Sequence, residues 1–215
     1  MIRVLLVDDH PVVRAGYARL LEQTGDISVV AEASNAEQGY ALAQADPLPE
    51  VIVADLSMPG AGGLDLIRRV LARDARARIL VFSMHDSEPL VRRAFEAGAL
   101  GFVSKSSAPE MLVQAVRAVH AGRRLVSPDL APLLASPAQT SDGLLSQLTE
   151  REFVLFRLLA EGRSLAECAR ALKLSVKTVS NYQSTIRDKL GVGTSAALAH
   201  LAIRTGVIKS SGQAL

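Results

Sequence analysis

Short apolar runs and helix-period segments alternate along the first 121 residues of the chain. The five runs, rich in Val, Ile and Leu, are residues 4–7, 29–33, 51–54, 79–82 and 101–103. Runs that are apolar at almost every position suit strands buried on both faces, as in a parallel sheet. Between them, apolar residues recur at the spacing of an amphipathic helix. The pattern therefore predicts an α/β fold: a doubly wound five-stranded parallel sheet, with ligands at the carboxyl ends of its strands.

A different pattern begins after this block. Residues 127–146 are rich in Pro, Ser and Gly, which is a linker composition, and the patterns beyond them are all helical. We predict a first domain over residues 1–122, a linker over 123–144 and an all-α domain over 145–215. Capping-box patterns mark three helix starts, at Ser107 with Glu110, Thr149 with Glu152 and Ser164 with Glu167.

Composition narrows the class of protein. Of the 215 residues 49% are apolar and 21% are charged, as in folded rather than disordered chains. The apolar runs fall far short of the roughly 18–20 residues that span a bilayer. The first run also ends in two carboxylates, unlike a signal peptide. The single cysteine, Cys168, excludes an internal disulfide and fits a reducing compartment. We expect a cytoplasmic protein without a membrane partner.

Charge is distributed unevenly between the two blocks. Residues 1–140 carry 14 Lys and Arg against 16 Asp and Glu, a net charge of −2. Residues 141–215 carry 10 against 6, a net charge of +4. The basic second block is therefore the candidate for binding an anionic polymer.

Acidic residues stand at the ends of two predicted strands. Asp8 and Asp9 follow the first strand and Asp55 follows the third. These strands are neighbours in a doubly wound sheet, so the three carboxylates should converge. Crowded carboxylates repel one another, and a hard cation such as Mg²⁺ relieves the repulsion. Ser83 after the fourth strand and Lys105 after the fifth complete a site for a phosphoryl group, with Asp55 as the nucleophile.

Each of these residues also has a simpler interpretation. An acid at a strand end commonly forms a turn or caps a helix, and Ser83 alone would be a loop residue. The combination of all five makes coincidence the weaker interpretation. The glycines of segment 60–63 lack the spacing of a dinucleotide fingerprint. His10 and His85 have no Cys or His partner at ligand spacing, and we interpret them as loop residues.

Two predicted helices, 164–172 and 176–190, have the spacing of a helix-turn-helix. At about 100° per residue, one face of the second helix is apolar and carries Val176, Val179, Ile186 and Leu190. The opposite face is polar and carries Lys177, Asn181, Ser184, Thr185 and Asp188, with Ser180 on its flank. A polar face suits either base reading in the major groove or plain solvent exposure. The helical wheel alone favours solvent exposure.

The first block resembles the receiver domains of two-component response regulators over roughly residues 1–122. The motifs are Val7-Asp8-Asp9-His10, Asp-Leu-Ser-Met-Pro-Gly at 55–60, Ser83 and Phe102-Val-Ser-Lys105. The resemblance implies that Asp55 accepts phosphate from a sensor histidine kinase. It implies that Mg²⁺ is held by Asp8, Asp9, Asp55 and the carbonyl oxygen of Ser57. Lys105 would bind the phosphoryl group, while the Ser83 hydroxyl moves to it and the Phe102 ring turns inward behind.

The second block resembles the LuxR-type DNA-binding domain over roughly residues 145–209. The matching segments are 148–152, 158–162, 175–179 and 189–192. The resemblance implies DNA contacts by Lys177, Thr178, Ser180, Asn181, Ser184, Thr185 and Lys189. It also implies that the last helix, besides packing in the core, makes a dimer contact through Leu198, Leu201 and Ala202. Ser180 and Tyr182 replace a common Lys and His, so the family's usual base contacts do not carry over.

The whole chain thus resembles the NarL/FixJ family of response regulators. The expected function is phosphorylation-dependent transcriptional regulation, with no enzymatic activity beyond phosphorylation and dephosphorylation at Asp55. Expected partners are a sensor histidine kinase, double-stranded DNA and, when phosphorylated or DNA-bound, a second copy; RNA polymerase is a further candidate. Two alternatives stay open: a Mg²⁺-dependent phosphotransferase or phosphatase, and a receiver that mainly binds proteins beside a vestigial tail. The basic helix-turn-helix argues against the enzyme, since catalysis does not need it.

Overall fold

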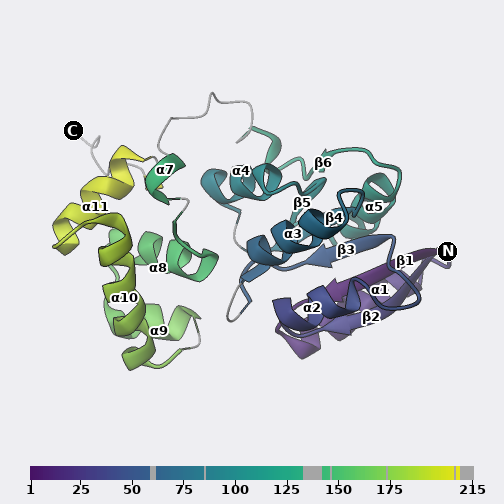
Figure 1. Cartoon of the computed structure of the whole chain (residues 1–215), viewed down its shortest axis with the longest axis horizontal. Helices are drawn as coiled ribbons and strands as arrows, with labels where there is room; N and C mark the ends of the chain where they lie inside the picture. The colour runs from purple at the N-terminus through teal and green to yellow at the C-terminus, as the bar shows by residue number, and fades with distance from the viewer. Residues whose placement is uncertain are drawn as a thin grey trace. The chain divides into compact units, whose positions relative to one another are not determined.

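The computed structural model describes residues 1–58, 62–84, 86–132, 142–145, 147–172, 174–205 and 207–208. The chain forms two compact units, Met1–Ser136 and Pro137–Leu215 (Figure 1). The division falls inside the predicted linker, and the domain boundaries themselves stay a prediction. Residues 60–61, His85 and the middle of the predicted linker lie outside the described residues. None of the helices in the described ranges is both long enough and apolar enough to cross a membrane.

Parallel strands form the sheet of the first unit, in the order β2-β1-β3-β4-β5-β6 (Figure 1). Their bounds are β1 Ile2–Val7, β2 Ile27–Ala33, β3 Val51–Ala54, β4 Ile79–Ser83, β5 Gly101–Ser104 and β6 Leu125–Val126. The five predicted strands are confirmed within two residues at each end. The two-residue β6 was not predicted; it lies in the segment assigned to the linker and pairs with β5. β3, β4 and β5 are buried at every residue, which explains their unbroken apolar character.

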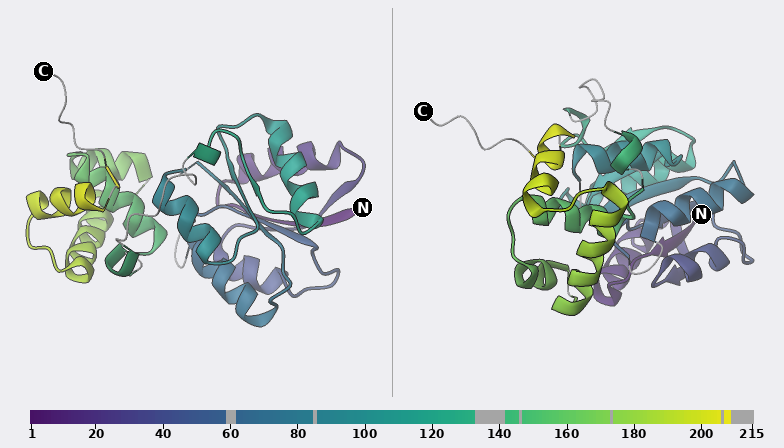
Figure 2. Two further views of the ribbon diagram at one scale, coloured as in Figure 1. Left: turned by 90° about the horizontal axis from the view of Figure 1, so that it is seen from above. Right: turned by 60° about the vertical axis from the view of Figure 1, so that its left-hand side comes forward.

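Helices cover both faces of this sheet (Figures 1 and 2). On one face, α1 (Pro11–Glu22) and α5 (Pro109–His120) close a core in which Leu21, Leu112 and Val116 are fully buried against the strands. On the other lie α2 (Ala36–Leu42), α3 (Gly62–Arg73) and α4 (Glu88–Glu96), packed in sequence beside one another. This two-sided cover leaves the carboxyl ends of the strands as the edge where loops can build a site.

The start of α5 differs from the prediction. Its N-cap is Ala108, which makes no side-chain hydrogen bond, and a proline stands in the first turn. The Ser107 hydroxyl donates instead to Asp129 Oδ1, at 3.1 Å. The predicted capping box is therefore wrong: proline fixes the backbone at the helix start, and Ser107 contacts a residue beyond β6.

Among the described residues of the second unit, all regular secondary structure is helical. Its helices are α7 (Asp142–Leu145), α8 (Glu150–Ala160), α9 (Leu165–Leu172), α10 (Val176–Leu190) and α11 (Ser195–Arg204). Both capping boxes predicted here are confirmed by reciprocal hydrogen bonds: Thr149 with Glu152, and Ser164 with Glu167. α9 and α10 form the predicted helix-turn-helix, and α10 ends where Gly191 adopts a left-handed φ of 64°. α8 packs against α9, α10 and α11, burying Phe153 and Phe156.

Candidate functional site

Three carboxylates meet at the carboxyl edge of the sheet. Asp8 and Asp9 follow β1 and Asp55 follows β3, and these strands pair in parallel up to Val7 and Ala54. One ligand atom each from Asp8, Asp9, His10 and Asp55 lies within 4.8 Å of all the others. Asp8 and Asp55 are only 6% and 4% exposed. The predicted convergence of the acids is therefore confirmed, in a partly desolvated pocket.

Lys105 neutralises part of this negative charge. From the end of β5, its Nζ lies 2.6 Å from Asp8 Oδ2 and 2.6 Å from Asp55 Oδ2, and its side chain is 5% exposed. Burial of the ammonium group lowers the pKa of Lys105, but the carboxylates of Asp55 and Asp8 raise it by more. The pKa of Lys105 is therefore above its usual value, and the group stays charged at neutral pH.

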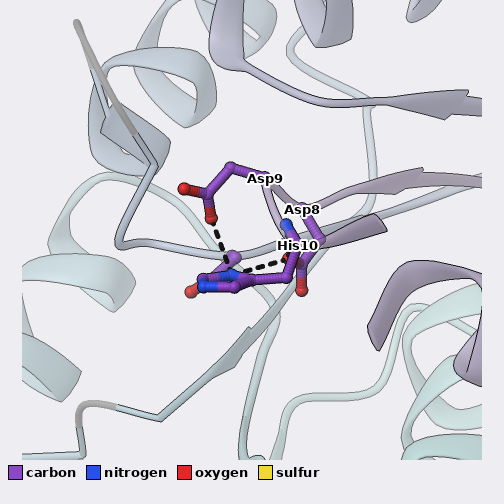
Figure 3. A group of neighbouring side chains, drawn as sticks. Asp8, Asp9 and His10 are labelled. Carbon is purple, nitrogen blue, oxygen red and sulfur yellow. Dashed lines mark hydrogen bonds and ion pairs between the residues drawn. The ribbon is translucent and has the colours of Figure 1, made fainter. Parts of the chain in front are cut away.

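His10 joins the cluster, which the sequence analysis did not predict. Its backbone N–H donates to Asp8 Oδ1 at 2.7 Å, and its ring Nδ1 lies 2.9 Å from Asp9 Oδ1 (Figure 3). His10 does lie in the loop between β1 and α1, as predicted, but its aspartate contacts add it to the cluster. The signal that could have revealed it is adjacency, because the residue after two clustered acids lies within reach of both.

The donors at this edge suit a hard divalent cation. All three acids offer carboxylate oxygens, the ligands that Mg²⁺ prefers. The backbone of Ser57 runs beside them: its N–H donates to Asp55 Oδ1 at 3.1 Å. The buried Ser57 hydroxyl oxygen has no hydrogen-bond partner among the described residues. Close packing fixes this loop, because a Cβ on Gly63 would lie 2.2 Å from the Asp55 carbonyl oxygen.

Ser83 and Phe102 lie on neighbouring strands behind the carboxylates. Ser83 ends β4 and is fully buried, and its carbonyl oxygen accepts from the Lys105 N–H at 2.9 Å. Phe102 pairs with Val81 across β4 and β5. Its ring is also fully buried.

A second buried hydroxyl at this edge was not predicted. Ser104 pairs with Ser83 in the sheet register and is fully buried. Its Oγ donates to Asp86 Oδ2 at 3.0 Å and lies 2.7 Å from Ser106 Oγ. The contact ties the end of β5 to the segment after β4. Nothing in the sequence indicated it, since Ser104 and Asp86 are 18 positions apart.

The predicted DNA-contact residues of α10 fall into two groups. Five are exposed: Lys177, Ser180, Asn181, Ser184 and Thr185. Of these, Thr185 also donates its hydroxyl to the Asn181 carbonyl oxygen, at 3.2 Å. The other two contact their own domain. Thr178 Oγ1 lies 2.7 Å from Oγ of Ser175, the N-cap of the helix. Lys189 Nζ lies 2.7 and 2.9 Å from the two carboxylate oxygens of Glu152, a residue only 4% exposed.

The apolar face of α10 is confirmed with one exception. Val179, Ile186 and Leu190 are buried. Val176, the remaining residue of this apolar face, is 49% exposed, so the face is not buried along its whole length. It is the first residue of the helix, before the point at which the neighbouring helices cover that face.

The predicted dimer residues lie in the core. Leu198, Leu201 and Ala202 of α11 are 1%, 5% and 0% exposed, and α11 packs on α8. Side chains that are buried in their own domain present no surface to a second chain. Their burial confirms the core-packing role and corrects the prediction that these three residues form a dimer contact.

Comparison with known proteins agrees with both halves of the fold. Residues 4–117 match the response regulator receiver domain, and residues 146–202 match the luxR family of bacterial regulatory proteins. The chain is 38% identical over 211 residues to the response regulator UvrY of Escherichia coli K12, covering 96% of both chains. It is 35% identical over 214 residues to the response regulator GacA of Pseudomonas aeruginosa, covering 98% of this chain and 100% of GacA. A solved structure of two RcsB dimers bound to two parallel DNAs covers 94% of this chain and 98% of RcsB, with 28% identity and a TM-score of 0.59.

Proposed function

The chain belongs to the two-component response regulators that join a receiver domain to a luxR-family DNA-binding domain, and we propose that phosphorylation of its Asp55 controls DNA binding. Members of this family regulate transcription and are not conventional enzymes. One observation carries the assignment of Asp55: the buried Lys105 ammonium lies 2.6 Å from both Asp55 and Asp8. A cation held there can contact the oxygens of a phosphoryl group on Asp55.

The proposed donor is a phosphohistidine on a sensor histidine kinase. A carboxylate oxygen of Asp55 attacks the phosphorus atom, and the P–O bond forms as the P–N bond breaks. The released imidazole nitrogen takes up a proton. Lys105 stays protonated and balances the charge on the phosphoryl oxygens, because its pKa is raised. Loss of the phosphoryl group to water would reset the protein, so chemistry at Asp55 is confined to its own phosphorylation and dephosphorylation.

We assign Asp8, Asp9, Asp55 and the carbonyl oxygen of Ser57 as ligands of Mg²⁺. When bound, the ion neutralises the oxygens of the transferring phosphoryl group. The assignment is supported by the convergence of the ligand atoms within 4.8 Å and by their all-oxygen chemistry. Asp9 also contacts His10, so its carboxylate is oriented by the imidazole rather than free to rotate.

Ser83 and Phe102 form the proposed link from Asp55 to the rest of the protein. The Ser83 hydroxyl would donate to a phosphoryl oxygen, and the ring of Phe102 fills the space on the next strand. Because this ring is already buried, we propose that phosphorylation stabilises the inward arrangement rather than creating it. The consequence is a population shift between two states of the receiver surface.

For DNA, we propose that α10 enters the major groove and contacts it through Lys177, Ser180, Asn181, Ser184 and Thr185. Their exposure supports this set. Thr178 and Lys189 are left out, because both are only partly exposed and are engaged by a helix cap and by an ion pair with Glu152.

Binding as a dimer is part of the proposal, and the RcsB dimers on DNA support it by similarity. Its contact surface must use residues other than the buried Leu198, Leu201 and Ala202. A regulator of transcription meets both DNA and RNA polymerase in the cytoplasm, which is where we place this protein.

The test combines phosphorylation and DNA binding in the full chain. Acetyl phosphate should add one phosphoryl group to the wild type, measured by intact mass, and raise its affinity for DNA selected from a random pool. Asp55→Asn should lose both responses and keep its fold. Asp65→Asn, a matched change at an exposed carboxylate of α3, should keep both. Labelling of Asp55→Asn at the wild-type level, or equal DNA affinity with and without phosphate, would refute the proposal.

A further inference from the structure

Val176 is the one exposed apolar side chain of α10, a helix described at every residue. It is 49% exposed, whereas Val179, one turn further on, is fully buried. The helix start is well fixed, because the Ser175 side chain caps it by accepting from the Thr178 N–H at 3.0 Å. Val176 is therefore held outward at the amino end of the second helix of the helix-turn-helix.

The neighbours of Val176 on this face are short. At about 100° per residue, Ser180 and Ser184 continue the same row along the helix, four and eight positions on. Both are exposed. Short side chains let a helix approach the floor of a groove closely, where a longer row would hold it away. Lys177 and Asn181 form the parallel row beside them and supply a cation and an amide.

We propose that the Val176 methyl groups pack against the 5-methyl group of a thymine in the major groove, and that this contact selects thymine at one position of each half-site. The inference rests on the proposed function, and it names a specificity-determining residue of the DNA-binding surface. Thymine is the chemical match because it is the one standard base that presents an apolar group in the major groove. A valine has no hydrogen-bonding group with which to read any other base.

The expected effect is small and specific. Packing one methyl group against an apolar partner changes Kd by about fourfold, equivalent to about 0.8 kcal/mol. Replacing thymine by deoxyuracil removes that methyl group and leaves the hydrogen-bonding groups of the base unchanged. A loss on this replacement therefore reports the apolar contact alone.

The experiment uses the full chain treated with acetyl phosphate and a duplex selected by it from a random pool. Each thymine is replaced by deoxyuracil in turn and Kd is measured. One replacement per half-site should weaken wild-type binding about fourfold, and Val176→Ala should bind the thymine and uracil duplexes equally. Ile203→Ala, which shortens an apolar side chain of α11 that is 43% exposed, should keep the wild-type discrimination.

The possible results separate the inference from its premise. Recovery of no DNA from the pool would overturn the proposed function and the inference together. Selective binding that is equal for every thymine and uracil duplex would overturn the inference and leave the function standing. Discrimination that persists in Val176→Ala would assign the methyl contact to another residue and would equally overturn it.

Discussion

Replacing Lys105 by methionine should destabilise the first unit when no divalent cation is present. Methionine keeps the apolar stem but removes an ammonium group that is 2.6 Å from each of two carboxylates. The Lys105 side chain is 5% exposed, and the side chains of Asp8 and Asp55 are 9% and 4% exposed, so water cannot replace the lost charge. Removing one partner of a buried ion pair costs about 3–5 kcal/mol. We expect a loss of that size in the free energy of unfolding at pH 7.

At alkaline pH the stabilisation by Lys105 is lost. The pKa of Lys105 is raised in the folded protein, so its stabilisation is complete below the usual pKa of about 10.5 and is lost as pH rises through the folded value. The advantage of wild type over Lys105→Met should persist from neutral pH to about pH 10.5 and disappear above it. Added Mg²⁺ should also reduce the difference at pH 7. Without the Lys105 cation beside Asp8 and Asp55, the folded variant should bind the ion more tightly and be stabilised more than wild type.

Hydrogen exchange measured by mass spectrometry reports the stability of the two units separately, peptide by peptide. Peptides from β1 and β3 should lose protection in Lys105→Met under chelating conditions, and regain part of it with Mg²⁺. Lys177→Met, which removes the same group from the exposed face of α10, should leave these peptides unchanged. Equal protection of β1 and β3 in wild type and Lys105→Met without Mg²⁺ would refute the reasoning.

Three further predictions follow from the contacts. Asp9→Ala should weaken Mg²⁺ binding and acetyl-phosphate labelling together; undiminished labelling at limiting Mg²⁺ would argue against the ligand set. Lys177→Ala should weaken binding to all duplexes and reduce the slope of log affinity against log salt concentration by about one unit. Asn181→Ala should instead cost about 1–3 kcal/mol of binding free energy at one base pair. Salt titrations and base-substituted duplexes would show if these roles are reversed. Lys189→Met should lower the free energy of hydrogen-exchange protection in α8 and α10 by about 1–3 kcal/mol. The loss is smaller than for a fully buried ion pair because the Lys189 side chain is 33% exposed. Unchanged hydrogen exchange in α8 and α10 would mean that Glu152 does not need its partner.

The sheet and its carboxylate cluster could be predicted because both follow from backbone periodicity. A strand buried on two faces must be apolar at nearly every position, so β3, β4 and β5 can be recognised as apolar runs in the sequence. Once the strand order is known, residues that follow adjacent parallel strands must meet. That argument places Asp8, Asp9 and Asp55 together without any knowledge of side-chain contacts.

Short elements and side-chain contacts could not be predicted in this way. β6 has two half-buried residues, too few for a periodic signal. The Ser104–Asp86 hydrogen bond depends on rotamers, which sequence spacing does not determine. Likewise Lys189 and Glu152 are 37 positions apart, so no sequence pattern indicates that Lys189 pairs within its own domain.

Similarity to the family predicts the positions of the receiver residues of this chain but not the DNA sequence that it binds. The receiver fold fixes where Asp55 and Lys105 stand, because each follows a buried strand whose register leaves no freedom. Under the proposed function, a change at either position would remove the phosphorylation chemistry. Ser180 and Val176 are under no such constraint, since both are exposed and the helix packs through Val179 on its other side. Under the proposed DNA contacts, substitution there should leave the fold intact and alter only the DNA sequence that is bound. Related chains can therefore share the phosphorylation site and still read different operators, and for this chain the operator must be measured on its own α10.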